Sequence, residues 1–205
     1  MKTFLFKSAL IGIMILSIVT MSCNKPIESK TFTDSRDGKT YKYVKIGDQE
    51  WMMENFAFKA DTGCWAYNND EGNVATYGYL YTYETAKNIC PDGWHIPSTD
   101  ECNMLIDYVG GPIKAAYKMM EPSAEYWGNN TSDKVTNSSG FSALPGGCYM
   151  NNVSMFMYKG LFAYWWTNTE GAESDDIEIM HTNNQVIQFR DHHKLSGFSI
   201  RYIKD

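Results

Sequence analysis

The sequence has 205 residues and a formal net charge of −6 at pH 7, from 18 Lys and Arg against 24 Asp and Glu. Nucleic acids and anionic membrane surfaces are bound through clustered basic side chains, and we find no such cluster, which argues against both as partners. The first predicted element is an export signal, in which Lys2 and Lys7 precede an uncharged, mostly apolar stretch over residues 8–21. As a helix this stretch would reach roughly 21 Å, short of the roughly 30 Å core of a bilayer, which favours a cleaved signal over a lasting membrane span.

The end of this leader predicts a lipid anchor. Ser22 before Cys23 resembles a lipobox, where bacterial signal peptidase II cuts after the cysteine is acylated; an ordinary cleaved signal is the alternative. We therefore expect a signal peptide over residues 1–22, a short polar tether over 23–30 and one domain over 31–205. The expected location is the cell envelope, most simply the outer membrane, with the periplasmic or surface face left open.

A β-hairpin is predicted at the start of the domain. Tyr41 and Tyr43 alternate with their neighbours ahead of Gly47 and Asp48, and a second strand follows over residues 49–53. Glycine at the first central position of a type II′ turn supplies the positive φ that this turn requires.

Two helices are predicted in the middle of the chain. Thr82 can cap the first, over residues 83–88, and Ser98 with Glu101 forms a capping box for the second. The apolar residues of the second helix follow the spacing of one buried face, and they are Cys102, Leu105, Ile106 and Val109. A further helical turn or two is expected over residues 113–120.

The second half of the chain favours strands and loops. Residues 125–140 are rich in Asn, Ser and Thr, which indicates an irregular surface connection. Strands are expected over residues 141–144, 163–167, 177–180, 185–189 and 198–203. The predicted class is therefore α+β, with the helices grouped in the first half.

Several segments together resemble the family called the Fibrobacter succinogenes major paralogous domain, which is common in lipoproteins of gut bacteria. The matching segments are Asp37-Gly38-Lys39 with Tyr41, Ile46-Gly47 with Gln49, Trp51-Met52, Glu54-Asn55, Tyr77-Gly78 with Leu80-Tyr81, Cys90-Pro91-Asp92-Gly93-Trp94-His95-Ile96-Pro97, Gly140-Phe141-Ser142-Ala143-Leu144-Pro145-Gly146-Gly147, Tyr164-Trp165-Trp166-Thr167-Asn168-Thr169-Glu170 and Gly197-Phe198-Ser199-Ile200-Arg201. Their number and order, from about residue 31 to residue 205, identify the chain as similar to this family.

The resemblance implies a fold similar to C-type lectins, with two main helices packed on twisted antiparallel sheets and long loops on one side. It brings no settled activity, and a shared scaffold does not establish sugar binding. The family pattern also implies a cysteine near Tyr202, which is absent here.

Four cysteines remain after the lipidated one, and an even number in an oxidising compartment permits two disulfides in any of three pairings. They are Cys64, Cys90, Cys102 and Cys148. We expect a bridge between Cys102 and Cys148, with Cys64 and Cys90 either paired or free.

No catalytic signature is found in the sequence. The strained G-x-S-x-G elbow of serine hydrolases is absent, and structural cysteines explain the thiols more simply than a Cys-His enzyme that uses one of the four histidines. We therefore expect no enzyme, with a formylglycine-generating type of lectin-like enzyme as the remaining catalytic alternative.

Calcium is the metal that the sequence best accommodates. His192 and His193 are adjacent and would point to opposite faces of a strand, which suits a transition metal poorly. Two acidic, Asn-containing segments offer oxygen ligands, among them Asp70, Glu71, Asp175 and Asp176. Ordinary acidic turns are the simpler interpretation, so no cofactor is expected beyond a structural calcium.

Aromatic residues make up 15% of the sequence and include six tryptophans. Indole faces can stack on sugar rings while amides bind the hydroxyls, so Trp127, Trp166 and Asn168 are the candidate ligand-binding residues. We expect a non-catalytic recognition or adhesion module for an extracytoplasmic glycan or protein. A structural or assembly component of a surface complex is the alternative.

Overall fold

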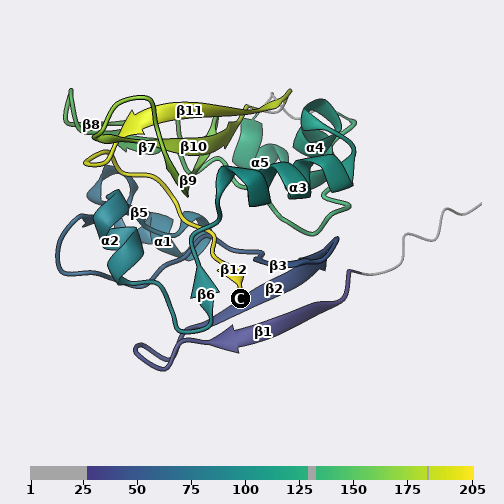
Figure 1. Cartoon of the computed structure of the whole chain (residues 1–205), viewed down its shortest axis with the longest axis horizontal. Coiled ribbons are helices and arrows are strands. Elements are labelled where there is room, and N and C mark those ends of the chain that lie inside the picture. The colour runs from purple at the N-terminus through teal and green to yellow at the C-terminus, as the bar shows by residue number, and fades with distance from the viewer. Residues whose placement is uncertain (1–26, 129–132, 184) are drawn as a thin grey trace, which may run out of the picture.

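The computed structural model describes residues 27–128, 133–183 and 185–205, so the predicted leader and Cys23 lie outside the described residues. The largest sheet within these ranges is antiparallel, with the strand order β1-β2-β3-β12-β6 (Figure 1). Its strands are β1 (Ser29–Thr33), β2 (Thr40–Ile46), β3 (Gln49–Met52), β12 (Ile203–Lys204) and β6 (Trp94–His95). The C-terminal strand β12 therefore lies between β3 and β6, which both come from the first half of the sequence.

The predicted first hairpin is present as β2 and β3. Ile46 pairs with Gln49 across the turn, and Gly47 has the positive φ of 63° that the sequence indicated. Tyr41 and Tyr43 are buried in one cluster and Val44 in another, so both faces of β2 are covered.

Three smaller antiparallel sheets complete the β-structure of the described residues. A three-stranded sheet has the order β11-β10-β9, and the other two have two strands each. The strands are β9 (Ala163–Glu170), β10 (Asp176–Thr182), β11 (Ile187–His193), β4 (Cys64–Trp65), β5 (Leu80–Tyr81), β7 (Cys148–Met150) and β8 (Met155–Met157). No strand forms over residues 141–144, where an isolated bridge at Ala143 is the only pairing.

The α-helices of the described residues are α1 (Val74–Tyr77), α2 (Tyr83–Asn88), α3 (Thr99–Val109), α4 (Pro112–Met119) and α5 (Ala124–Trp127). The hydroxyl of Thr82 accepts a hydrogen bond from the Thr85 amide at the start of α2. The capping box of α3 is confirmed, because Ser98 and Glu101 exchange both of the expected hydrogen bonds. Two 3-10 turns, Tyr67–Asn69 and Glu71–Asn73, precede α1.

The mixed α+β class is confirmed, but the expectation of two main helices packed on twisted sheets with long loops is wrong. All five α-helices of the described residues are short, and the longest, α3, has 11 residues. The strands are divided among four small sheets instead of one dominant framework. Glycines, prolines and polar turns interrupt the chain too often for longer elements to form.

Two buried clusters form the core. One contains Tyr41, Phe56 and Trp166, and it packs between the main sheet and α2. The other joins Trp51 to the buried faces of α3 and α4, which lie against the three-stranded sheet. The predicted apolar face of α3 is confirmed, because its residues Cys102, Leu105, Ile106 and Val109 are all buried.

The ordered domain begins earlier than the sequence predicted. Strand β1 starts at Ser29, within the segment 23–30 interpreted as a tether, and pairs with β2 from Ser29 opposite Val44 to Thr33 opposite Thr40. The chain between Cys23 and the domain is therefore shorter than expected. Within the described ranges, we find no helix with the length and apolar character needed to cross a bilayer.

Candidate functional site

The buried guanidinium of Arg201 is the centre of a polar network that reaches an open surface hollow through Asn55 and Ser142. Its Nε donates to Oδ1 of Asn55 at 2.8 Å, and its two terminal nitrogens donate to the carbonyl oxygens of Phe141 and Ser142. The Phe141 and Trp165 rings also flank the guanidinium. Burial lowers the pKa of Arg201 to about 9, against the opposing attraction of Glu54.

Asn55 connects this arginine to the surrounding elements. Its Oδ1 also accepts a hydrogen bond of 2.9 Å from Nε1 of Trp165, and its Nδ2 donates to the carbonyl oxygen of Tyr77 at 2.8 Å. A further contact of 3.3 Å reaches Oγ of Ser199. One amide side chain thus joins the end of β3, the end of α1, strand β9 and the segment before β12.

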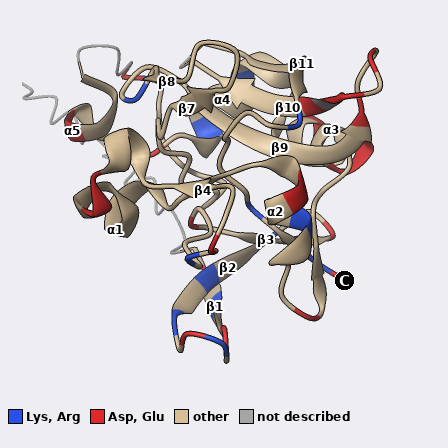
Figure 2. Ribbon diagram, turned by 90° about the vertical axis from the view of Figure 1, so that its left-hand side faces the viewer, with Lys and Arg blue, Asp and Glu red and all other residues tan. Residues whose placement is uncertain are grey.

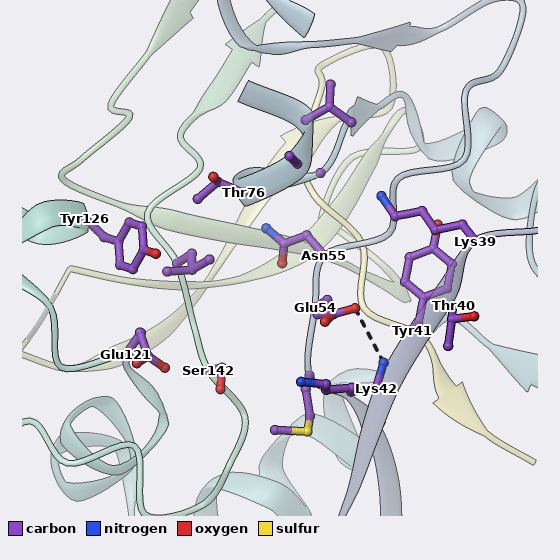
Figure 3. Close-up of a pocket in the computed structure, with 15 residues that line it drawn as sticks. Lys39, Thr40, Tyr41, Lys42, Glu54, Asn55, Thr76, Glu121, Tyr126 and Ser142 are labelled. Atoms are coloured by element: carbon purple, nitrogen blue, oxygen red, sulfur yellow. Dashed lines mark hydrogen bonds between the residues drawn. The ribbon is translucent and has the colours of Figure 1, made fainter. Parts of the chain in front are cut away.

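The hollow is an open cleft of about 490 Å³ beside this network (Figure 3). Its walls come from the start of β2, the chain after β3, helix α1, the region of α5 and residues 142–144. The polar lining residues are Lys39, Thr40, Lys42, Glu54, Asn55, Thr76, Glu121, Tyr126 and Ser142. We call this hollow the polar cleft.

Charged groups of both signs line the polar cleft. The Lys42 backbone amide donates to Oε2 of Glu54 at 3.4 Å, while Oε2 of Glu121 accepts a hydrogen bond of 2.8 Å from Asn137. Partial burial lowers the pKa of Lys39, against the opposing effects of Asp37 and Glu54. Carboxylates accept hydrogen bonds and lysines donate them, so the cleft can bind a ligand that carries both donors and acceptors.

The Tyr126 ring stands at one side of the polar cleft, and the ring of Tyr77, which does not line the cleft, packs against it. Tyr77 and Tyr126 are both partly exposed, and their rings meet edge to face with centroids 6.4 Å apart. Figure 3 shows the Tyr126 side chain on the same side of the hollow as Glu121. The Tyr126 ring therefore offers a ligand an apolar surface next to hydrogen-bonding groups.

The two candidate tryptophans do not line this cleft. Trp127 and Trp166 are fully buried, so the expectation that they present rings for stacking on a ligand is wrong. Nε1 of Trp166 donates to the Tyr81 carbonyl at 2.7 Å, whereas Nε1 of Trp127 is buried without a partner among the described residues. Asn168 is exposed on β9 and lies outside the cleft.

The expected bridge between Cys102 and Cys148 is also wrong. All four cysteines of the described residues are free thiols, and these two lie in different buried clusters. Cys64 and Cys90 are half-buried, and Sγ of Cys90 donates to the Trp94 carbonyl at 3.0 Å. Burial raises the pKa of Cys64 to about 11, so its thiol is protonated near neutral pH.

The acidic residues considered for calcium lie in two separate turns. The Asp70 side chain caps the Gly72 amide at 2.9 Å, and Glu71 pairs with Lys59 at 2.6 Å and with the Tyr79 hydroxyl at 2.5 Å. The other two, Asp175 and Asp176, lie at the start of β10, where their carbonyl oxygens accept backbone hydrogen bonds. Within the described ranges, no three His, Cys, Asp or Glu side chains are grouped to hold a metal.

The histidines have partners other than the cysteines. His95 lies between two carboxylates, with Nδ1 2.7 Å from Asp205 and Nε2 2.9 Å from Glu101. His181 is stacked on Tyr164, and burial lowers its pKa to about 4.

Sequence reasoning missed the residues of the polar cleft. Glu54, Asn55 and Arg201 stand in segments that carried the family resemblance, but no spacing rule joined residues about 150 positions apart. The available signal was an arginine within an apolar segment, since such a residue needs buried hydrogen-bond acceptors.

The comparisons with known proteins give one finding. A family model described as the Fibrobacter succinogenes major domain matches residues 44–204, which is more than three quarters of the chain. The matched range contains most of the polar cleft, including Glu54, Asn55 and Glu121, and it contains Arg201, which bonds to Asn55. No curated protein and no solved structure matches the chain.

Proposed function

Since the chain belongs to the Fibrobacter succinogenes major domain family, we propose that it is a non-catalytic, lipid-anchored recognition module of the bacterial cell envelope. The ligand is an extracytoplasmic glycan or protein, and it binds in the polar cleft. Acylated Cys23 attaches the module to a membrane, in the simplest case the outer membrane. No nucleic acid and no cofactor is part of the proposal.

The polar cleft is the observation that carries the proposal. Ligand sites are concave and combine apolar surface with a few fixed polar groups, and the cleft combines the Tyr126 ring with Glu54 and Glu121. Its floor is held by the Asn55 and Arg201 network, which ties the backbone at Tyr77 and Ser142 to the chain after β3. A rigid floor reduces the entropy that binding would otherwise cost.

A glycan is the ligand class that this lining fits best. Sugar hydroxyls both donate and accept hydrogen bonds, which suits a mixture of carboxylates, lysines and hydroxyl groups. Because Trp127 and Trp166 are buried, recognition depends on hydrogen bonds and on the phenol ring of Tyr126. Moderate affinity is expected for such an open site.

An array of glycans and extracytoplasmic proteins tests this function. The unlipidated domain should bind a subset of glycans, and Glu54→Gln together with Glu121→Gln should abolish that binding. Glu173→Gln is the matched control, because this exposed carboxylate lies outside the cleft. If the domain at high concentration bound no glycan and no protein on the array, the proposal would be contradicted.

A structural or assembly role is the second candidate, favoured by exposed apolar residues around the β7–β8 hairpin. They are Val153, Met155, Tyr158 and Leu161, each more than two fifths exposed. Stable co-purification with envelope proteins after crosslinking, lost in a Val153→Gln, Met155→Gln variant, would favour this role over ligand recognition.

A further inference from the structure

Two large apolar side chains project from the outer face of α3. Met104 and Tyr108 are 57% and 68% exposed, and their four-residue spacing places them on one side of the helix. Both line a hollow at the turn between β2 and β3. A Cβ at Gly47 of that turn would stand 3.2 Å from the Tyr108 ring, so helix and turn form one continuous surface.

The first described residue of the chain joins the same surface. Ile27 is 42% exposed and lines a second hollow together with Gly47 and Tyr108. Its position is fixed by packing, because a Cβ at Gly140 would lie 2.7 Å from Cγ2 of Ile27. We call the surface formed by Ile27, Met104 and Tyr108 the tether-side face.

The length of chain before Ile27 limits where this face can lie. Four peptide units separate Cys23 from Ile27, and they span at most about 14 Å when fully extended. An acyl group on Cys23 therefore keeps Ile27, and with it the near edge of the tether-side face, within about 14 Å of the anchored cysteine. Methionine, isoleucine and tyrosine are suited to the boundary between lipid and water, since the apolar part enters the lipid and the phenol hydroxyl stays hydrated.

We propose that the tether-side face docks on the lipid surface in which Cys23 is anchored. This inference rests on the proposed lipid anchor. The contact uses apolar burial, not basic charge, which agrees with the acidic balance of the chain. It fixes the orientation of the domain on the membrane, while the acyl chains supply the attachment.

The exposed apolar residues of the β7–β8 hairpin provide an internal control. Val153 and Met155 are apolar side chains that are 52% and 57% exposed, which is similar to the exposure of the residues of the tether-side face. Figure 1 shows this hairpin at the far end of the molecule from the start of β1, where the tether joins. If exposed apolar side chains simply adsorbed on lipid, both surfaces would contact the membrane. If the tether-side face docks, it alone contacts the membrane.

Photoactivated lipid crosslinking tests the inference on the full chain. The protein is expressed in a bacterium that processes lipoproteins and reconstituted in vesicles of phosphatidylethanolamine and phosphatidylcholine that contain a photoreactive phosphatidylcholine. Mass spectrometry then maps the lipid adducts. We expect adducts on peptides that carry Met104 and Tyr108, their loss in a Met104→Gln, Tyr108→Gln variant, and no change in a Val153→Gln, Met155→Gln variant.

The mass of the N-terminal peptide shows whether Cys23 is acylated, so it distinguishes failure of the docking proposal from failure of the lipid anchor. An acylated Cys23 with no adducts on α3, or with equal adducts on α3 and the hairpin, would overturn docking and leave the lipid anchor intact. A chain that lacks the acyl group at Cys23 would overturn both the anchor and the docking that depends on it.

Discussion

The guanidinium of Arg201 and the side-chain oxygen of Asn55 form a buried hydrogen bond of 2.8 Å between residues 146 positions apart in the sequence. The same oxygen accepts from Nε1 of Trp165, so one acceptor serves two buried donors. This contact ties the last segment of the chain to the floor of the polar cleft. The stability of the domain and the shape of the cleft therefore depend on the same few atoms.

Asn55→Ala should destabilise the domain strongly. The substitution leaves Nε of Arg201 and Nε1 of Trp165 buried without this acceptor, and we expect a loss of about 3 kcal/mol or more. Denaturant unfolding measures the change, and Asn168→Ala, at an exposed position, should stay within about 0.5 kcal/mol of the parent. Equal, small effects for both variants would contradict the role of the network.

Two glycines with similar φ should respond differently to alanine. Gly147 has φ of 67°, and a Cβ there would stand 2.4 Å from the Met157 carbonyl oxygen and 2.5 Å from the Lys159 amide nitrogen. Gly93 has φ of 79° with nothing within 4 Å. Thermal or denaturant unfolding should show a cost of about 1–2 kcal/mol for Gly93→Ala, from φ alone, and about 3 kcal/mol or more for Gly147→Ala.

His95 should stabilise the domain most at mildly acidic pH. Partial burial lowers its pKa, but hydrogen bonds with Glu101 and Asp205 outweigh that effect and raise the pKa above the usual value. A raised pKa in the folded state means that the contribution is present below about pH 6.5 and is lost as pH rises through the folded-state value.

The comparison with His95→Gln measures this contribution directly. The difference in unfolding free energy between parent and variant should shrink as pH rises above about 6.5, the ordinary value for histidine. An NMR titration of the His95 ring gives the folded-state pKa independently. A difference that stays constant from pH 5 to pH 9 would exclude the two carboxylate contacts as its source.

The four cysteines of the described residues should titrate as buried thiols. Burial raises the pKa of Cys90 and of Cys148 to about 12 and that of Cys102 further, so little thiolate exists at neutral pH. A thiol reagent should react slowly with the folded protein and count four thiols after denaturation. A count of zero would mean two disulfides, and a fast-reacting thiol in the folded protein would revive the enzyme hypothesis.

Local signals in the sequence predicted local structure well. The capping box at Ser98, the cap at Thr82 and the turn at Gly47 each depend on residues close together in the chain, and all three are present. The family was identified for a similar reason, because its segments are short and ordered along the chain. The packing of the helices and the division of the strands into four small sheets depend on long-range contacts that no local pattern contains.

Burial explains why the expectations about the two tryptophans and the disulfide were wrong. The sequence shows that Trp127 and Trp166 are large and flat, but their exposure depends on which segments cover them. The thiols of Cys102 and Cys148 lie in separate buried clusters, because Cys102 is on α3 and Cys148 is on β7 and these elements pack in different parts of the core. The polar cleft escaped prediction because Glu54, Glu121 and Tyr126 meet only in the folded chain.

NMR mapping of ligand binding tests the central claim most directly. The ¹⁵N-labelled domain is titrated with the pooled oligosaccharides of the array, and the backbone amide shifts are followed. Recognition in the polar cleft predicts that the amides of Lys42, Glu54 and Glu121 shift together and that the Glu54→Gln, Glu121→Gln variant loses the response. Shifts confined to the β7–β8 hairpin, or no shifts at saturating concentration, would contradict it.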